Sequence, residues 1–174
     1  MKDKYNHKKL GKKKKKKRIN SRAKGNTFER KIAKLLNETF NLKEFSRTPG
    51  SGAYATTHEL PEHLKIYGDL ITPKKFKYTV ECKKGYNKEN IISLLNYSSD
   101  LWKFIEQSEK DAEKSGKEPL MIYQQDRQPA IAVVRKTSFP KRGPNIEVKK
   151  YRIYYLDDLL KLEKSYCFTQ DEQE

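Results

Sequence analysis

The sequence predicts a mixed α/β domain, in which a mixed β-sheet is flanked by helices. Three observations lead to this fold class. Residues 27–40 repeat apolar side chains at helical spacing, residues 76–84 alternate like a half-buried strand, and residues 88–114 form a second helical stretch before three strand-like segments. Because helices and strands are interspersed along one chain, we expect the helices to cover the faces of one sheet.

The length and composition of the chain fit one globular domain. Its 174 residues are 34% hydrophobic and 36% charged, so the core is small, although 11% aromatic residues can fill it. No apolar run approaches the ~20 residues of a membrane span, and the basic N-terminus lacks the apolar segment of a secretory signal. Cys82 and Cys167 give no disulfide framework. We therefore expect no membrane partner and a reducing compartment such as the cytoplasm.

The net charge of +16 is concentrated at the N-terminus. Residues 1–22 carry 12 basic groups and one acidic group, whereas residues 23–174 are only mildly basic. We expect a disordered lysine-rich arm over residues 1–22 and a folded domain over residues 23–174, because consecutive ammonium groups repel one another and bury no apolar surface. The arm would bind the phosphates of DNA through Lys12, Lys13, Lys14, Lys15, Lys16, Lys17 and Arg18. A solubilising tail and a nuclear-import signal are the alternatives.

The first predicted helix, residues 27–40, has one acidic residue on its apolar side. Its apolar arc consists of Phe28, Ile32, Leu35, Leu36 and Phe40. Glu29 falls inside this arc, where a carboxylate is costly unless it is paired. Either Glu29 is a functional group, or it closes a capping box with Asn26 as the N-cap.

The elements after this helix are predicted in the following order. Residues 46–58 form a Gly/Ser/Thr-rich loop that begins near Arg47, and residues 66–71 and 76–84 form a hairpin. A long helix over residues 88–114 ends at Gly116 and Pro119. Strands follow over residues 120–123, 130–135 and 151–156, with a basic loop over residues 136–150 and a short helix over residues 157–162.

The hairpin carries two carboxylates and a lysine that suit metal-ion chemistry. Alternation along the strand places Glu81 and Lys83 on one face, and a turn centred near Lys75 would bring Asp69 opposite Glu81. Two carboxylates at this spacing repel one another unless a cation lies between them. Mg²⁺ prefers oxygen ligands and keeps several waters, which suits phosphodiester hydrolysis. Taken alone, such a spacing is common, and an ordinary cross-strand surface cluster is its more frequent explanation.

The order of these motifs resembles the PD-(D/E)XK nuclease superfamily, and most of all the archaeal and phage-type Holliday junction resolvases. The resemblance rests on the helix with an inward Glu, the Gly-Ser-Gly loop, Gly-Asp-Leu-Ile and Val-Glu-Cys-Lys-Lys, and covers residues 23–86 well and residues up to 123 loosely. It implies a restriction-endonuclease-like fold. The departure is Gly68, which stands where the superfamily usually has proline.

The resemblance also implies roles for single residues. Glu29, Asp69, Glu81 and Lys83 would be catalytic, with Asp69, Glu81, Glu29 and the Cys82 carbonyl as metal ligands. Ser51 would lie near the scissile phosphate, and we expect Arg47 and Lys84 to contact DNA.

The function implied is that of a Mg²⁺-dependent DNA endonuclease, with Mn²⁺ as an alternative ion, that resolves branched DNA in recombination or repair. Two paired cuts in one junction favour a homodimer, and a phage or other microbial source suits such a protein. The alternatives are a restriction-like or nicking endonuclease with another DNA preference, and a nuclease-like DNA-binding module without activity.

Overall fold

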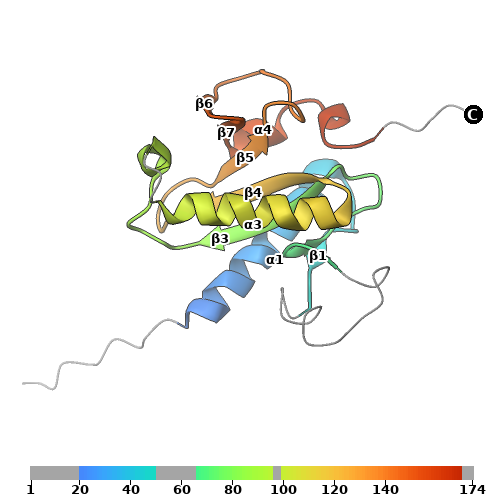
Figure 1. Ribbon diagram of the computed structural model, residues 1–174. Coiled ribbons are helices and arrows are strands. Elements are labelled where there is room, and N and C mark those ends of the chain that lie inside the picture. Colours follow the sequence, from blue (N-terminus) through green and yellow to red (C-terminus); the bar gives the residue numbers. More distant parts are fainter. Residues whose placement is uncertain (1–19, 50–65, 96–98, 170–174) are drawn as a thin grey trace, which may run out of the picture.

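The computed structural model describes residues 20–49, 66–95 and 99–169. Within them, five strands form one sheet in the order β3–β4–β5–β7–β6 (Figure 1). These strands are β3 (Tyr78–Lys84), β4 (Glu118–Gln124), β5 (Ile131–Arg135), β6 (Ile146–Val148) and β7 (Tyr151–Tyr155). Strands β3 and β4 are parallel and the other pairs are antiparallel, so the predicted mixed sheet is confirmed.

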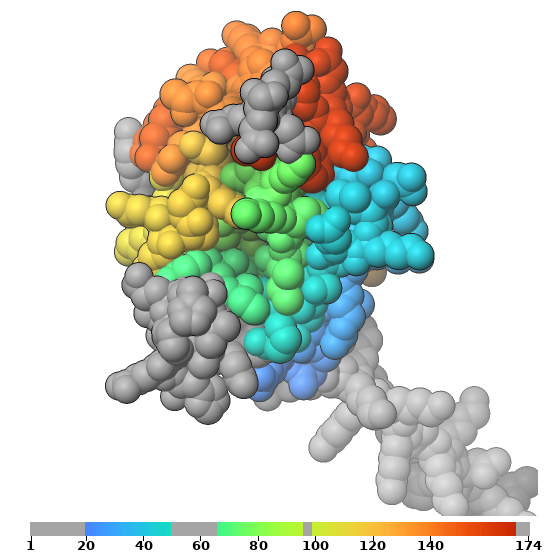
Figure 2. Space-filling view, turned by 90° about the vertical axis from the view of Figure 1, so that its right-hand side faces the viewer, coloured from blue at the N-terminus to red at the C-terminus, as the bar shows by residue number. Residues whose placement is uncertain are grey.

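Helices cover both faces of this sheet, as predicted. α1 (Ser21–Phe40) and α4 (Leu156–Leu160) share one apolar core with the inward side chains of β3, and the 3₁₀ helix η2 (Ile91–Leu95) and α3 (Asp100–Ser115) share a second core on the opposite face. In the space-filling view, green surface atoms lie between the cyan atoms on one side and the yellow atoms of α3 on the other (Figure 2). None of the helices in the described ranges combines the length and the apolar character that a bilayer crossing requires.

Helix α1 begins six residues before its predicted start. Asn20 caps it, because its side-chain oxygen accepts hydrogen bonds from the amides of Arg22 and Ala23 at 3.0 and 3.4 Å. Asn26 therefore lies inside the helix, and the capping-box interpretation of Glu29 is wrong. The residues of the predicted arm before Asn20 lie outside the described part of the chain.

The predicted long helix over residues 88–114 is wrong as a single element. The chain forms η2 first, and Ser99 then caps α3 by accepting a hydrogen bond from the Leu101 amide at 3.1 Å. The indole of Trp102 donates to the Leu94 carbonyl at 3.2 Å and so ties the two segments together. The predicted end is confirmed, since Gly116 closes α3 in the left-handed conformation with φ of 67°.

The predicted hairpin of residues 66–71 with 76–84 is also wrong in its pairing. β2 (Leu70–Ile71) pairs with β1 (Ser46–Arg47) in a separate two-stranded sheet, and it reaches β3 through the Asp69 amide, which donates to the Val80 carbonyl at 2.8 Å. Within β3 the predicted alternation holds, because Tyr78, Val80 and Cys82 face the core beside α1.

The C-terminal third departs from prediction in two smaller ways. Residues 136–150 are not a continuous loop, because they contain β6, which pairs with β7. The last helix, α4, begins at Leu156 and ends at Leu160, one residue earlier at its start and two earlier at its end than predicted.

Candidate active site

Asp69 is held at the open edge of β3 by three hydrogen bonds. Its amide donates to the Val80 carbonyl at 2.8 Å, and its carbonyl accepts from the Thr48 amide at 2.9 Å. Its carboxylate oxygen Oδ2 accepts from the Cys82 amide at 2.8 Å. The backbone of the β1–β2 unit thus fixes the carboxylate beside β3, although the expected hairpin is absent.

Gly68 makes this close approach feasible. Its φ of +78° lies in the left-handed region, which proline cannot adopt. A Cβ atom at this position would lie 2.7 Å from the Val80 carbonyl oxygen. The departure from the superfamily pattern at Gly68 therefore has a physical cause, because this chain approaches β3 too closely for any side chain at this position.

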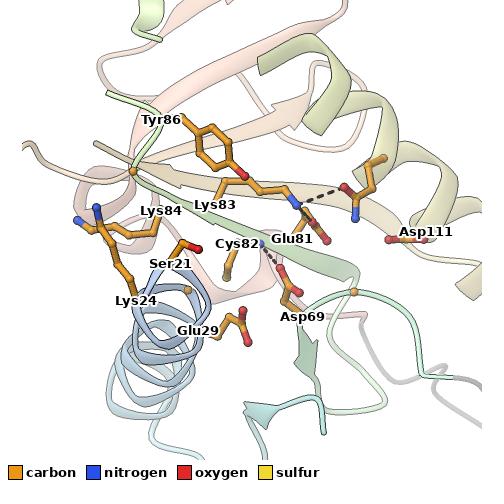
Figure 3. Close-up of a pocket in the computed structure, with 14 residues that line it drawn as sticks. Ser21, Lys24, Glu29, Asp69, Glu81, Cys82, Lys83, Lys84, Tyr86 and Asp111 are labelled. Atoms are coloured by element: carbon orange, nitrogen blue, oxygen red, sulfur yellow. Dashed lines mark hydrogen bonds and ion pairs between the residues drawn. The ribbon is translucent and has the colours of Figure 1, made fainter. Parts of the chain in front are cut away.

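Glu81 and Lys83 lie on the face of β3 that α3 covers (Figure 3). Lys83 Nζ is 2.5 Å from Glu81 Oε1 and donates a hydrogen bond to Gln107 Oε1 of α3 at 3.2 Å. Glu81 is 2% exposed, and within the described residues its Oε1 atom has no well-directed hydrogen bond despite the nearby ammonium. A buried oxygen in this state can accept a further cation.

Glu29 projects from α1 toward Asp69 (Figure 3) and is buried. Its Oε2 atom accepts a hydrogen bond from Arg47 Nε at 2.6 Å, and Arg47 also donates to Asn26 Oδ1 at 3.0 Å. The cost of a carboxylate on the apolar side of α1 is thus offset by an arginine from β1. Arg47, which the resemblance placed close to the scissile phosphate, is an ion-pair partner of Glu29 in this structure.

The two carboxylates at the edge of β3 are expensive to ionise. Burial, and then the nearby charges of Glu29 and Asp111, raise the pKa of Asp69 to about 6. The hydrogen bond from the Cys82 amide acts in the opposite direction and lowers it. Burial and the charge of Asp69 raise the pKa of Glu81 to about 7, against the attraction of Lys83. Burial alone would lower the pKa of Lys83, but the negative charge of Glu81 at 2.5 Å outweighs this effect and raises it. Lys83 is therefore protonated at neutral pH.

The donor set fits a hard divalent cation with few protein ligands. In the described ranges, no group of three or more His, Cys, Asp or Glu side chains is arranged as a metal site. The Cys82 amide points to Asp69, and since the amide and carbonyl of one strand residue point the same way, the Cys82 carbonyl faces the same edge. Asp69, Glu81 and this carbonyl offer oxygen ligands, which suit Mg²⁺ with its remaining waters. Glu29, which pairs with Arg47, faces the same cavity from α1.

These groups line one cavity of about 500 Å³ between α1, β3 and α3 (Figure 3). The cavity also contains residues that the sequence analysis did not select: Ser21, Lys24, Gln107 and Asp111. Lys24 precedes Phe28 by one helical turn. It was missed because the helix was predicted to begin only at Thr27. Gln107 and Asp111 follow Phe104 at helical spacing on α3. Ser51 and the residues Lys12 to Arg18 lie outside the described residues.

Residues 20–153 match the model of the family described as "Phage putative PDDEXK endonuclease". The chain belongs to this family. Protein D14 of Escherichia phage T5 is similar to it, with 34% identity over 115 residues that cover 63% of this chain and 67% of the phage protein. A search of solved structures found no match.

Membership of the PD-(D/E)XK endonuclease family confirms the coarse prediction, a nuclease with a restriction-endonuclease-like fold. The matched residues include Glu29, Asp69, Glu81 and Lys83. Nucleases of this class generally use divalent metal ions, which agrees with the oxygen donors at the edge of β3.

Proposed function

We propose that the protein is a Mg²⁺-dependent DNA endonuclease, with Mn²⁺ as an alternative ion, whose substrate is branched DNA. The observation that carries the proposal is the pair Asp69 and Glu81, two buried carboxylates of raised pKa, with Lys83 2.5 Å from one of them. Ionisation of two neighbouring buried carboxylates is unfavourable in the free protein. A bound cation would make their ionisation favourable, and the cation can in turn bind a phosphate.

Asp69, Glu81 and the Cys82 carbonyl would hold the metal ion. The ion would supply an activated water and would neutralise charge on the phosphate under attack. Because Lys83 is protonated, it acts as a hydrogen-bond donor rather than as a base, and it positions the attacking water and stabilises the developing negative charge. Gln107 limits the motion of its ammonium group from the side of α3.

Glu29 and Ser51 complete the proposed catalytic group. Glu29 faces the cavity from α1 with its orientation fixed by Arg47, so it can orient a water of the metal shell. Ser51 belongs to the glycine-rich loop that follows Arg47 in the chain, and the motif resemblance supports its place near the scissile phosphate.

The preference for branched DNA is supported by the motif resemblance to junction resolvases. The net charge of +16, most of it in the arm, supports DNA binding in general. Resolving a junction requires two symmetric cuts, so the active form would be a homodimer. The arm would add affinity that decreases steeply with salt. Sedimentation of the full chain with and without a four-way junction tests the dimer.

The activity test uses four labelled DNAs: a four-way junction, a nicked duplex, a linear duplex and a single strand. The full chain is incubated with Mg²⁺, with Mn²⁺ or with chelator, beside Asp69→Asn and Glu81→Gln. Lys161→Gln serves as the control, since Lys161 forms an exposed ion pair with Asp158 and does not line the cavity. Symmetric cuts in the junction alone, lost with chelator and in both carboxylate variants, support the proposal. Equal cutting of the linear duplex would keep the nuclease and reject the junction preference, and binding without any cleavage would reject the enzyme.

A further inference from the structure

Two lysines of a second charged cluster line the cavity, on the side away from Asp69 and Glu81 (Figure 3). Lys24 from α1 and Lys84 from the end of β3 converge on Asp126, which lies in the turn between β4 and β5. Lys24 Nζ is 2.6 Å from Asp126 Oδ2, and Lys84 Nζ is 3.9 Å from Asp126 Oδ1. Figure 3 shows the two ammonium groups next to one another, away from the carboxylates of Glu81 and Asp69.

Backbone and side-chain contacts fix this cluster. Lys24 Nζ packs close to Gly85, where a Cβ atom would lie 3.3 Å from the ammonium nitrogen. Asn87 donates to Asp126 Oδ2 at 2.8 Å and accepts from the Asp126 amide at 2.9 Å. Lys84 donates to the Gln125 carbonyl at 3.2 Å. The two lysines are therefore held in position rather than left to sample solvent.

The charges of the cluster are unbalanced. Two ammonium groups share one carboxylate, and the side chains of Lys24 and Lys84 are only 27% and 17% exposed. A second anion between the lysines would relieve the repulsion between their charges. The side chain of Lys84 lies over the Phe28 ring of α1, whereas that of Lys83 faces α3, so the two neighbouring lysines serve different parts of the cavity.

We propose that Lys24 and Lys84 together bind one backbone phosphate of the DNA strand, separate from the phosphate under attack at Asp69 and Glu81, with Asp126 as their counter-ion in the free protein. This inference rests on the proposed function, because it assumes a DNA strand in the cavity. It assigns to Lys24 a binding role and pairs it with Lys84. A phosphate held by two lysines fixes the register of the strand relative to the metal ligands.

The test measures the affinity for a linear duplex as a function of salt, in chelator, so that hydrolysis plays no part. The full chain is compared with Lys24→Gln, Lys84→Gln and the double variant, in which glutamine keeps most of the aliphatic stem. Lys161→Gln is the matched control, because it removes one positive charge from an exposed pair outside the cavity. Thermal melting confirms that each variant is folded.

If both lysines bind one phosphate, the double variant reduces the slope of log K against log salt by ~0.9 and weakens binding about eightfold at 0.1 M salt. The product of the two single effects then exceeds the effect of the double variant. A double variant that behaves like Lys161→Gln overturns the inference. A slope reduced by ~1.8 overturns it too, since it indicates two separate phosphate contacts.

The nuclease assay with Mg²⁺ decides the proposed function independently. If the lysine variants show the shared phosphate contact but the wild-type protein cleaves none of the four DNAs, the proposed nuclease activity is rejected and the phosphate-binding site stands. Cleavage together with unaffected binding in the double variant would keep the enzyme and reject the binding site.

Discussion

The carboxylate of Glu29 in α1 forms a buried ion pair with Arg47 in β1. Arg47 Nε donates to Glu29 Oε2 at 2.6 Å, and the two side chains are 16% and 8% exposed. The pair links α1 to β1, and β1 is the strand that pairs with β2 directly after Asp69. A change at Arg47 therefore acts on the position of the Asp69 carboxylate as well as on Glu29.

Removal of Arg47 alone should destabilise the protein strongly. Arg47→Met leaves a buried carboxylate without its partner, which costs about 3–5 kcal/mol. The double variant Glu29→Gln with Arg47→Met removes the uncompensated charge and should regain most of this loss. Urea unfolding of the four proteins in the cycle gives the coupling free energy.

The control for this cycle is the pair Lys34 and Glu38 on the same helix, with 78% and 63% of the two side chains exposed. Lys34→Met should cost less than ~1 kcal/mol, because an exposed pair is solvated and screened. Equal losses for Arg47→Met and Lys34→Met would show that the Glu29 pair is not an important buried contact.

The stability of the metal-free protein should decrease as the pH rises from about 5 to 7.5. The pKa of Asp69 is raised to about 6 and that of Glu81 to about 7, so the folded state binds more protons than the unfolded state in this range. The free energy of unfolding must then decrease with increasing pH. Mg²⁺ binds the deprotonated carboxylates, so its stabilising effect should be larger at pH 7.5 than at pH 5.5.

Melting temperatures measured across this range, in chelator and in Mg²⁺, check this dependence. Glu81→Gln is the comparison variant, because it removes one of the two carboxyl groups of raised pKa. Its profile in chelator should be flatter than that of the wild type. A wild-type profile that rises from pH 5 to 7.5 contradicts the assignment of the raised pKa values to the folded state.

Local patterns in the sequence carried much of this fold. Phe28, Ile32, Leu36 and Phe40 are all buried as their helical spacing predicts. The alternation along residues 76–84 placed Glu81 and Lys83 on a common face, because strand geometry allows no other arrangement. Where apolar residues recur at a regular helical or strand period, the pattern predicts which side of the helix or strand faces the core.

Tertiary contacts decided the elements that the sequence analysis missed. Apolar residues at helical spacing on both sides of the break favoured one continuous helix, although the polar residues Ser99 and Asp100 lie at the break between η2 and α3. β1 and β2 are two residues long each, too short to show any period, and their pairing depends on the close approach of Gly68 to β3. The cluster of Lys24, Lys84 and Asp126 joins three distant segments and has no local signal.

Glu109 should stabilise the attachment of α3 to the sheet above pH 4.5. Its carboxylate accepts hydrogen bonds from Arg135 Nε of β5 at 3.0 Å and from the Tyr151 hydroxyl of β7 at 2.8 Å. Burial alone would raise the pKa of Glu109, but these hydrogen bonds outweigh it and lower the pKa to about 2. The stabilisation is present above the unfolded-state pKa and is lost as the pH falls toward 2.

Glu109→Gln should therefore cost roughly 1–3 kcal/mol at pH 7 and much less near pH 2. Glu106→Gln on the exposed side of the same helix is the control, and it should change the free energy of unfolding by less than ~0.5 kcal/mol. Chemical denaturation at pH 7 and at acid pH measures both. A cost for Glu109→Gln that is the same at both pH values would contradict an ionic contribution.

Lys83 should affect the rate of cleavage far more than the affinity for metal. Its ammonium lies between Glu81 Oε1 and Gln107 Oε1, so Lys83→Met removes a donor from the reacting phosphate and leaves the oxygen ligands in place. We expect kcat to fall about 100-fold or more, as for the loss of other preorganised donors, while Mg²⁺ still raises the melting temperature. Gln107→Leu removes only the contact from α3 and should lower kcat less than tenfold. Full activity of Lys83→Met in single-turnover assays would exclude Lys83 from the reaction, and loss of the Mg²⁺ effect on melting would make it a structural partner of Glu81 instead.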